Sequence, residues 1–212
     1  VRRFSNSSRL SSSRRAAVTD FSFMKISPKV YIFPLLFLLV LPVSAQGLGD
    51  LEVINQTRLD YNKQGMLILG TWAVVNLILG AVGSFRTRGQ SQAFHQMNGY
   101  WNVVNLGIAG YGFWQASQVA VLNFWEVLLA QQEIEKILLA NAALDLGYIA
   151  LGLYLIERGR RTEKDKWLGF GKSIVLQGAF LLLFDVILYG FQQQLGIDLV
   201  ELGKSLVVLV EK

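Results

Sequence analysis

The chain has 212 residues, of which 52% are hydrophobic, and its mean hydropathy is +0.39. This composition is typical of a membrane protein rather than of a soluble domain. It holds no cysteine and a single histidine, which excludes disulfides, thiol catalysis, thiolate metal sites and multi-histidine metal or haem sites within one chain. The net charge of +5 comes from the first 45 residues, with seven basic residues and one acid, so it does not indicate nucleic-acid binding.

The first 45 residues have the character of a targeting sequence. Residues 24–45 show a basic start, a short apolar run and small residues before a cleavage position after Ala45, which is the layout of a secretory signal peptide. The alternative is an uncleaved anchor helix, and both place Gln46 outside. Residues 1–23 are rich in Ser and Arg, as in an organelle transit peptide. Because a complete signal begins at Met24, we interpret them as a non-native upstream extension.

Four apolar segments of 19 or 20 residues follow the signal. Each is long enough to cross ~30 Å of hydrocarbon at ~1.5 Å per residue. The second segment, with three Asn, is the least hydrophobic, and the other three lack the polar outer faces that a soluble bundle needs. The sequence therefore predicts an all-α integral membrane protein: an antiparallel four-helix bundle in residues 46–194, with spans at 66–85, 98–116, 137–156 and 172–191.

The charges of the connecting segments predict the orientation. With Gln46 outside, the segments after the first and third spans lie inside and carry eight basic residues against three acids, whereas the outside segments carry five against nine. The positive-inside rule agrees with the signal peptide. We therefore expect a bacterial plasma (inner) membrane protein whose mature N- and C-termini both face the periplasm. The inside basic residues are Arg86, Arg88, Arg158, Arg160, Arg161, Lys164, Lys166 and Lys172.

Two outside segments allow more than one interpretation. Residues 119–136 contain helix formers and an apolar stripe, which predicts either an amphipathic helix on the outer face or an outward extension of the third helix. The tail, residues 195–212, is mixed apolar and acidic and fits a helix or a strand. A shared Tyr-Gly-Phe at 111–113 and 189–191 suggests that the two helical hairpins are related repeats.

Each span places a strongly polar side chain near its middle. The midpoints predict one hydrogen-bonded layer at a single depth, with helical spacing extending it along each helix. The candidate site residues are Asn76, Asn105, Asn141, Asp145, Gln177, Asp185 and Tyr189. As helix-to-helix hydrogen bonds, such groups contribute about 0.6–2 kcal/mol per contact, which is the structural interpretation. Acids within a membrane also make a functional site a standing hypothesis.

Asp145 and Asp185 are the residues for which the functional hypothesis is most specific. An Asp at the bilayer centre costs ~2.5–3.5 kcal/mol, and no Lys or Arg is predicted at that depth. Their helices are joined by one inner loop, so we expect the two carboxyls to face each other and to share a proton. Asn76, Asn105 and Tyr189 would then be their nearest hydrogen-bond partners.

Other chemistry is weakly indicated. His95 is predicted in an inner loop without a convincing Ser-His-acid spacing, so we expect no nucleophile–base pair, metal site or cofactor. Gly80 with Gly83, and Gly107 with Gly110, are predicted to give small faces for close helix packing.

Residues 132–158, Gly169 to Lys172, and residues 176–180 with Phe184-Asp185 resemble an uncharacterised bacterial family. Its members are small four-helix membrane proteins with a secretory signal and no assigned function. The resemblance covers about residues 46–192 and implies the same fold and no activity. We favour a non-enzymatic structural or accessory membrane component, partnered by the lipid bilayer and by a membrane protein or a second copy, not by nucleic acid. The alternative is a small proton-linked transporter or ligand-binding membrane protein that uses the polar layer.

Overall fold

A computed structural model of the chain describes residues 51–118 and 122–210, so the predicted signal segment and the residues before it lie outside the described part. Four α-helices follow one another: α2 (Leu51–Arg86), α3 (Gly89–Ala116), α4 (Phe124–Thr162) and α5 (Asp165–Val210). No strand occurs among these residues. The predicted all-α fold is confirmed, and each predicted span falls within one helix.

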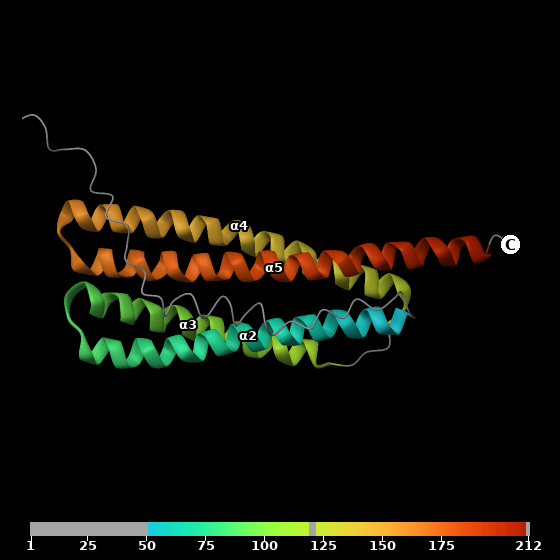
Figure 1. The fold of residues 1–212 in the computed structure, drawn as a ribbon, viewed down its shortest axis with the longest axis horizontal. Coiled ribbons are helices and arrows are strands. Elements are labelled where there is room, and N and C mark those ends of the chain that lie inside the picture. Colours follow the sequence, from blue (N-terminus) through green and yellow to red (C-terminus); the bar gives the residue numbers. More distant parts are fainter. Residues whose placement is uncertain (1–50, 119–121, 211–212) are drawn as a thin grey trace, which may run out of the picture. The chain divides into compact units, whose positions relative to one another are not determined.

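The helices form two antiparallel hairpins, α2 with α3 and α4 with α5 (Figure 1). The first turn is Thr87-Arg88, and Gly89 begins α3 with a φ of +59°, a left-handed conformation that favours glycine. The second turn begins at Glu163, which also takes a left-handed φ of 52° as the C-cap of α4. Both turns lie at the same end of the bundle, where Gly89 approaches Asp165. The basic residues predicted to lie inside therefore gather at one end.

The helices are longer than the apolar spans, at 36, 28, 39 and 46 residues. Hydropathy marks only the apolar part of a helix, whereas backbone hydrogen bonding continues into the polar ends. Residues 124–136 are the first turns of α4, started by a capping box between Asn123 and Glu126. They form no separate amphipathic helix, so the extension alternative is the correct one. The tail continues α5 as helix to Val210, which excludes a strand there.

These extensions are packed against one another. Ile54 of α2, Val127 of α4 and Leu199 of α5 form a buried apolar cluster, with Phe124 and Leu128 against it. The apolar stripe predicted in residues 119–136 thus supplies Phe124 and Leu128 to the interior, whereas Trp125 is exposed. The bundle core continues beyond the predicted ends of the spans.

Glycine sets the closest helix crossings. A Cβ added at Gly80 would lie 2.9 Å from the backbone N of Gly99, and one added at Gly152 would lie 2.8 Å from the carbonyl O of Gly171. Backbone atoms cannot move aside cheaply, so each hairpin needs glycine at its crossing. The expected small face at Gly107 and Gly110 makes no close helix contact in the described part of the chain, because a Cβ at either would have no neighbour there within 4 Å.

Within residues 51–118 and 122–210, three helices, α2, α4 and α5, are long and apolar enough to cross a membrane, as expected of a membrane protein. The helix α3, which contains the predicted span 98–116, is not apolar enough to be counted with them. The reason is its amides: Asn98, Asn102 and Asn105 are buried inside the bundle and lower its mean hydropathy. Its outward surface is nevertheless apolar, with exposed Val103, Val104, Leu106, Ile108 and Phe113.

Candidate functional site

The predicted polar residues occupy two separate groups rather than one layer. The first group is an amide network shared by α2, α3 and α5. The Nε1 of Trp72 donates to Oε1 of Gln177 at 2.9 Å, and the Nε2 of Gln177 donates to Oδ1 of Asn98. Asn98 in turn donates through Nδ2 to Oδ1 of Asn76 at 2.9 Å and to its backbone carbonyl at 3.2 Å. One continuous chain of hydrogen bonds therefore joins three helices.

The network extends along α3 by the spacing that the sequence predicted. Asn102 donates to the carbonyl of Asn98 at 2.8 Å, and Asn105 donates to Oδ1 of Asn102 at 3.4 Å. Asn76 uses its own Nδ2 on the carbonyl of Trp72, whose indole stacks on Phe180 at 3.8 Å between ring centroids. This stacking aims the indole N–H at Gln177. The amides are buried and partnered, which fits hydrogen bonds that fix the register of the helices.

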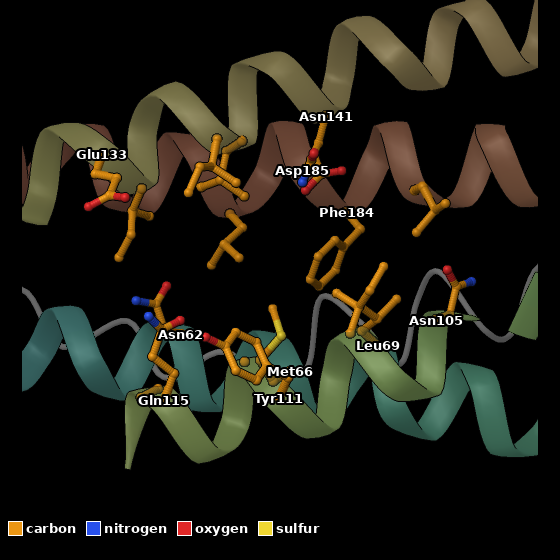
Figure 2. A pocket seen from close by; sticks show the side chains of 18 of the residues that line it. Asn62, Met66, Leu69, Asn105, Tyr111, Gln115, Glu133, Asn141, Phe184 and Asp185 are labelled. Atoms are coloured by element: carbon orange, nitrogen blue, oxygen red, sulfur yellow. The ribbon is translucent and has the colours of Figure 1, made fainter. Parts of the chain in front are cut away.

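The second group is a carboxyl pair between α4 and α5. The side chains of Asp145 and Asp185 lie within hydrogen-bonding reach of each other, and Asn141, one turn before Asp145, lies within reach of Asp185. Figure 2 shows Asn141 and Asp185 pointing toward each other. A hydrogen bond between two carboxyl groups needs a proton on one of them. Asp145 is only 3% exposed, and its Oδ2 has no hydrogen-bond partner among the described residues.

The expected adjacency of Asp145 and Asp185 is thus correct, but the single layer is wrong. On α5, Gln177 of the amide network and Asp185 of the carboxyl pair are eight residues apart, which is ~12 Å along the helix. Asn76 bonds to Trp72 and Asn98 and is not a partner of the acids. The physical reason is that α2 and α4 hardly touch, so the midpoints of their apolar segments need not share a level. Tyr189 is half-buried, and no hydrogen bond of its hydroxyl is present among the described residues.

A cavity of about 720 Å³ opens between the hairpins beside the carboxyl pair. It exists because α3 and α4 barely touch, while α5 packs against both. Asn105, Asn141, Asp145 and Asp185 all line it, so the Asn105 end of the amide network and the carboxyl pair share one space. Figure 2 shows Asn105 and Leu69 on the α2–α3 side of this space, with Phe184 and Asp185 on the opposite side. The remaining walls are mostly apolar.

A further polar cluster, which the sequence pattern did not predict, lies toward the end of the helices opposite the two turns. Gln192 donates to Oδ1 of Asn62 at 2.9 Å and to the carbonyl of Arg58 at 3.3 Å. Gln131 donates to the carbonyl of Gln192 and, at 2.9 Å, to Oε1 of Glu135. These residues lie outside the predicted spans. Glutamines that recur among apolar residues in 119–136 and after 191 were the available signal.

Arg58 is a buried cation in this cluster. Its Nε and Nη2 donate to Oδ1 of Asn55 at 3.2 and 2.7 Å, and it also lines the cavity. No carboxylate pairs with it among the described residues.

His95 lies within α3, not in a loop as expected. Its ring packs against Gly83 and meets the edge of Phe94, and its buried Nδ1 has no hydrogen-bond partner in the described part of the chain. In residues 51–118 and 122–210, no three of the His, Asp and Glu side chains are grouped to hold a metal ion.

A model of the family of unknown function DUF6992 matches residues 68–186. The chain belongs to this family. The match begins within α2 and ends just after Asp185, so it includes the amide network and the carboxyl pair. It agrees with the resemblance to an uncharacterised family and assigns no activity. No curated protein and no solved structure is significantly similar to the chain.

Proposed function

We propose that this protein is a non-enzymatic structural or accessory component of a bacterial plasma membrane. The observation that carries the proposal is the amide network, whose partnered side chains join α2, α3 and α5 inside an apolar bundle. Buried amides of this kind fix the register of neighbouring helices and need no ligand to explain them. No finding favours the proton-linked transporter as an alternative, and we expect neither a metal nor a cofactor.

The proposed topology has four crossings, with both mature ends outside after removal of a signal peptide. The turns between α2 and α3 and between α4 and α5 carry most of the basic residues, which supports placing that end inside. Since α2 and α4 run in the same direction, the chain has to return between them, and α3 is the segment that does so. The exposed apolar side chains of α3 fit contact with lipid.

Cysteine-accessibility labelling tests this topology directly, because the chain has no native cysteine. Lys164→Cys and Ser117→Cys are a matched pair of exposed positions at opposite ends of the bundle. In intact cells an impermeant maleimide should label residue 117 and spare residue 164 until the membrane is permeabilised. Labelling of residue 164 from outside would overturn the orientation.

We also propose that its partner is a membrane protein or a second copy of the chain, within the lipid bilayer, and that it binds no nucleic acid. The exposed apolar faces of α2, α3 and α4 support contact with lipid or with another helix. Purification in a mild detergent followed by native mass spectrometry would test this. A monomer carrying no protein or lipid would contradict it.

A further inference from the structure

The carboxyl pair is a buried polar group that the proposed structural role leaves incompletely explained. Asp145 Oδ2 is buried, has no hydrogen-bond partner among the described residues, and belongs to a residue that lines the cavity. A hydrogen bond between Asp145 and Asp185 needs only one proton, so the second carboxyl is free to ionise, and a negative charge there is costly in an apolar region unless it is compensated. The cation that also lines the cavity, Arg58, lies near Gln192, seven residues from Asp185 on α5, or ~10 Å along the helix. It is bonded to Asn55 and does not neutralise the pair.

The walls beside the acids are aromatic and aliphatic. Tyr148 lies one turn after Asp145 on α4, and its ring meets the ring of Trp101 at 4.8 Å and 86° across the gap between α4 and α3. Aromatic rings beside a carboxylate are a combination that favours organic cations, because ring faces attract positive charge. Leu181, Phe184 and Leu188 of α5 provide an apolar surface along the rest of the cavity.

The size and the position of the cavity fit a small amphipathic molecule. Its volume of about 720 Å³ lies within the range of ~300–1,000 Å³ usual for small-molecule sites. Val104 of α3 and Leu144 of α4 line it while remaining 61% and 55% exposed, so its rim is formed by side chains on the outer surface of the bundle. A molecule dissolved in the bilayer could thus enter sideways between α3 and α4.

We propose that this cavity binds an amphipathic organic cation, an amine carried on an apolar body. The ammonium group donates to Asp145 Oδ2 and neutralises the charge of the carboxyl pair, and the apolar body lies along α5. The charges select the amine: an anionic amphiphile would have its head group repelled by the acids and would be drawn to Arg58 instead. The proposal concerns this cavity alone and does not depend on which way the chain faces in the membrane.

The test uses the full chain in lipid nanodiscs and three probes of equal chain length: decylamine, decanol and decanoate. Trp101 in the cavity wall makes tryptophan fluorescence a direct readout, and Trp101→Phe shows how much of the signal arises there. Decylamine should bind with a Kd at least ten times lower than that of decanol or decanoate. Equal binding of all three probes would overturn the proposal, and so would tightest binding of decanoate, which would assign the cavity to anions at Arg58.

Two kinds of variant test the acidic charge and the open volume of the cavity separately. Asp145→Asn should weaken decylamine binding at least ten-fold and leave decanol unchanged, while Asp198→Asn, on the same helix as Asp185 but outside the cavity, should change neither. Val104→Trp keeps both acids and fills the rim, so it should weaken binding of decylamine and give an answer even if Asp145→Asn does not fold. Undiminished decylamine binding by Asp145→Asn or by Val104→Trp would disprove the site.

Discussion

The α2–α3 hairpin and the α4–α5 hairpin have similar backbone geometry but bury different polar groups. The first contributes neutral amides, Asn76, Asn98, Asn102 and Asn105, which bond to one another and to Gln177. The second holds a pair of carboxyls, of which Asp145 keeps one oxygen without a partner beside a cavity. Neutral groups that satisfy each other hold helices together. Acids that leave an acceptor open provide a place where another molecule can bind.

The backbones of the two hairpins are alike where their helices come closest. Gly80 meets Gly99 in one hairpin and Gly152 meets Gly171 in the other, and both pairs are 19 residues apart in the sequence. This equal spacing supports the idea that the hairpins are related repeats, which stays a prediction. If it holds, the hairpins differ in their polar side chains rather than in their backbone geometry.

The largest effect is expected at the glycine crossings. Gly80→Ala and Gly152→Ala should each lower the free energy of unfolding by about 1–3 kcal/mol, because the new Cβ meets backbone atoms of the partner helix. Reversible unfolding in mixed micelles would measure this. Gly107→Ala and Gly147→Ala are the controls, since a Cβ there meets nothing within 4 Å, and should be neutral or stabilising by up to ~1 kcal/mol. A loss of stability for only one of the two glycine variants would show that the crossings are not equivalent.

The amide network should show measurable coupling between helices. In a double-mutant cycle, Asn98→Leu and Gln177→Leu should give a coupling energy of about 0.6–1.7 kcal/mol, as for other hydrogen bonds within membrane proteins. The matched cycle pairs Asn98→Leu with Asp185→Leu, two turns away from Gln177 on α5. The effects of these two substitutions on the free energy of unfolding should add within ~0.5 kcal/mol. Similar coupling in both cycles would restore the idea of a single polar layer.

The carboxyl pair should be visible through its shared proton. Infrared spectra of the protein in nanodiscs should contain a carbonyl stretching band of a protonated carboxyl at neutral pH, because Asp145 and Asp185 lie within hydrogen-bonding reach of each other. Asp145→Asn and Asp185→Asn should each shift or remove this band, whereas Asn98→Leu in the other hairpin should leave it intact. A spectrum unchanged by both Asp variants would refute the shared proton.

The smallest effect is expected at the basic end of the α4–α5 hairpin. Glu157 pairs with Arg161 at 2.8 Å, and both are exposed, so Glu157→Gln should leave the unfolding midpoint unchanged within error at pH 7. Arg161 lowers the pKa of Glu157 below its ordinary value of 4.5, so the small stabilisation is present above that pH and is lost as the pH falls through the lowered pKa. A midpoint that differs between wild type and Glu157→Gln at pH 7 would indicate a stronger pair.

Local pattern was enough to predict the helices and the neighbours within a hairpin. Runs of apolar residues predict membrane-spanning helices because the backbone must satisfy its own hydrogen bonds in an apolar setting. The contact between Asp145 and Asp185 was also predictable, because a short turn fixes which residues of two antiparallel helices lie side by side. What hydropathy could not predict was where the helices end, since the polar segments around Arg58, Gln131 and Gln192 continue the same helices.

The relation between the two hairpins was decided only by the tertiary structure. No short turn constrains α2 against α4 or α5, so side-chain packing sets their offset, and it places Asn76 level with Gln177 rather than with Asp185. The same packing brings α5 against α3 while keeping α4 away from it, which creates the cavity. The sequence indicated that the amides and acids within the spans are buried. The packing between hairpins determined that the amides satisfy one another while Asp145 faces an open space.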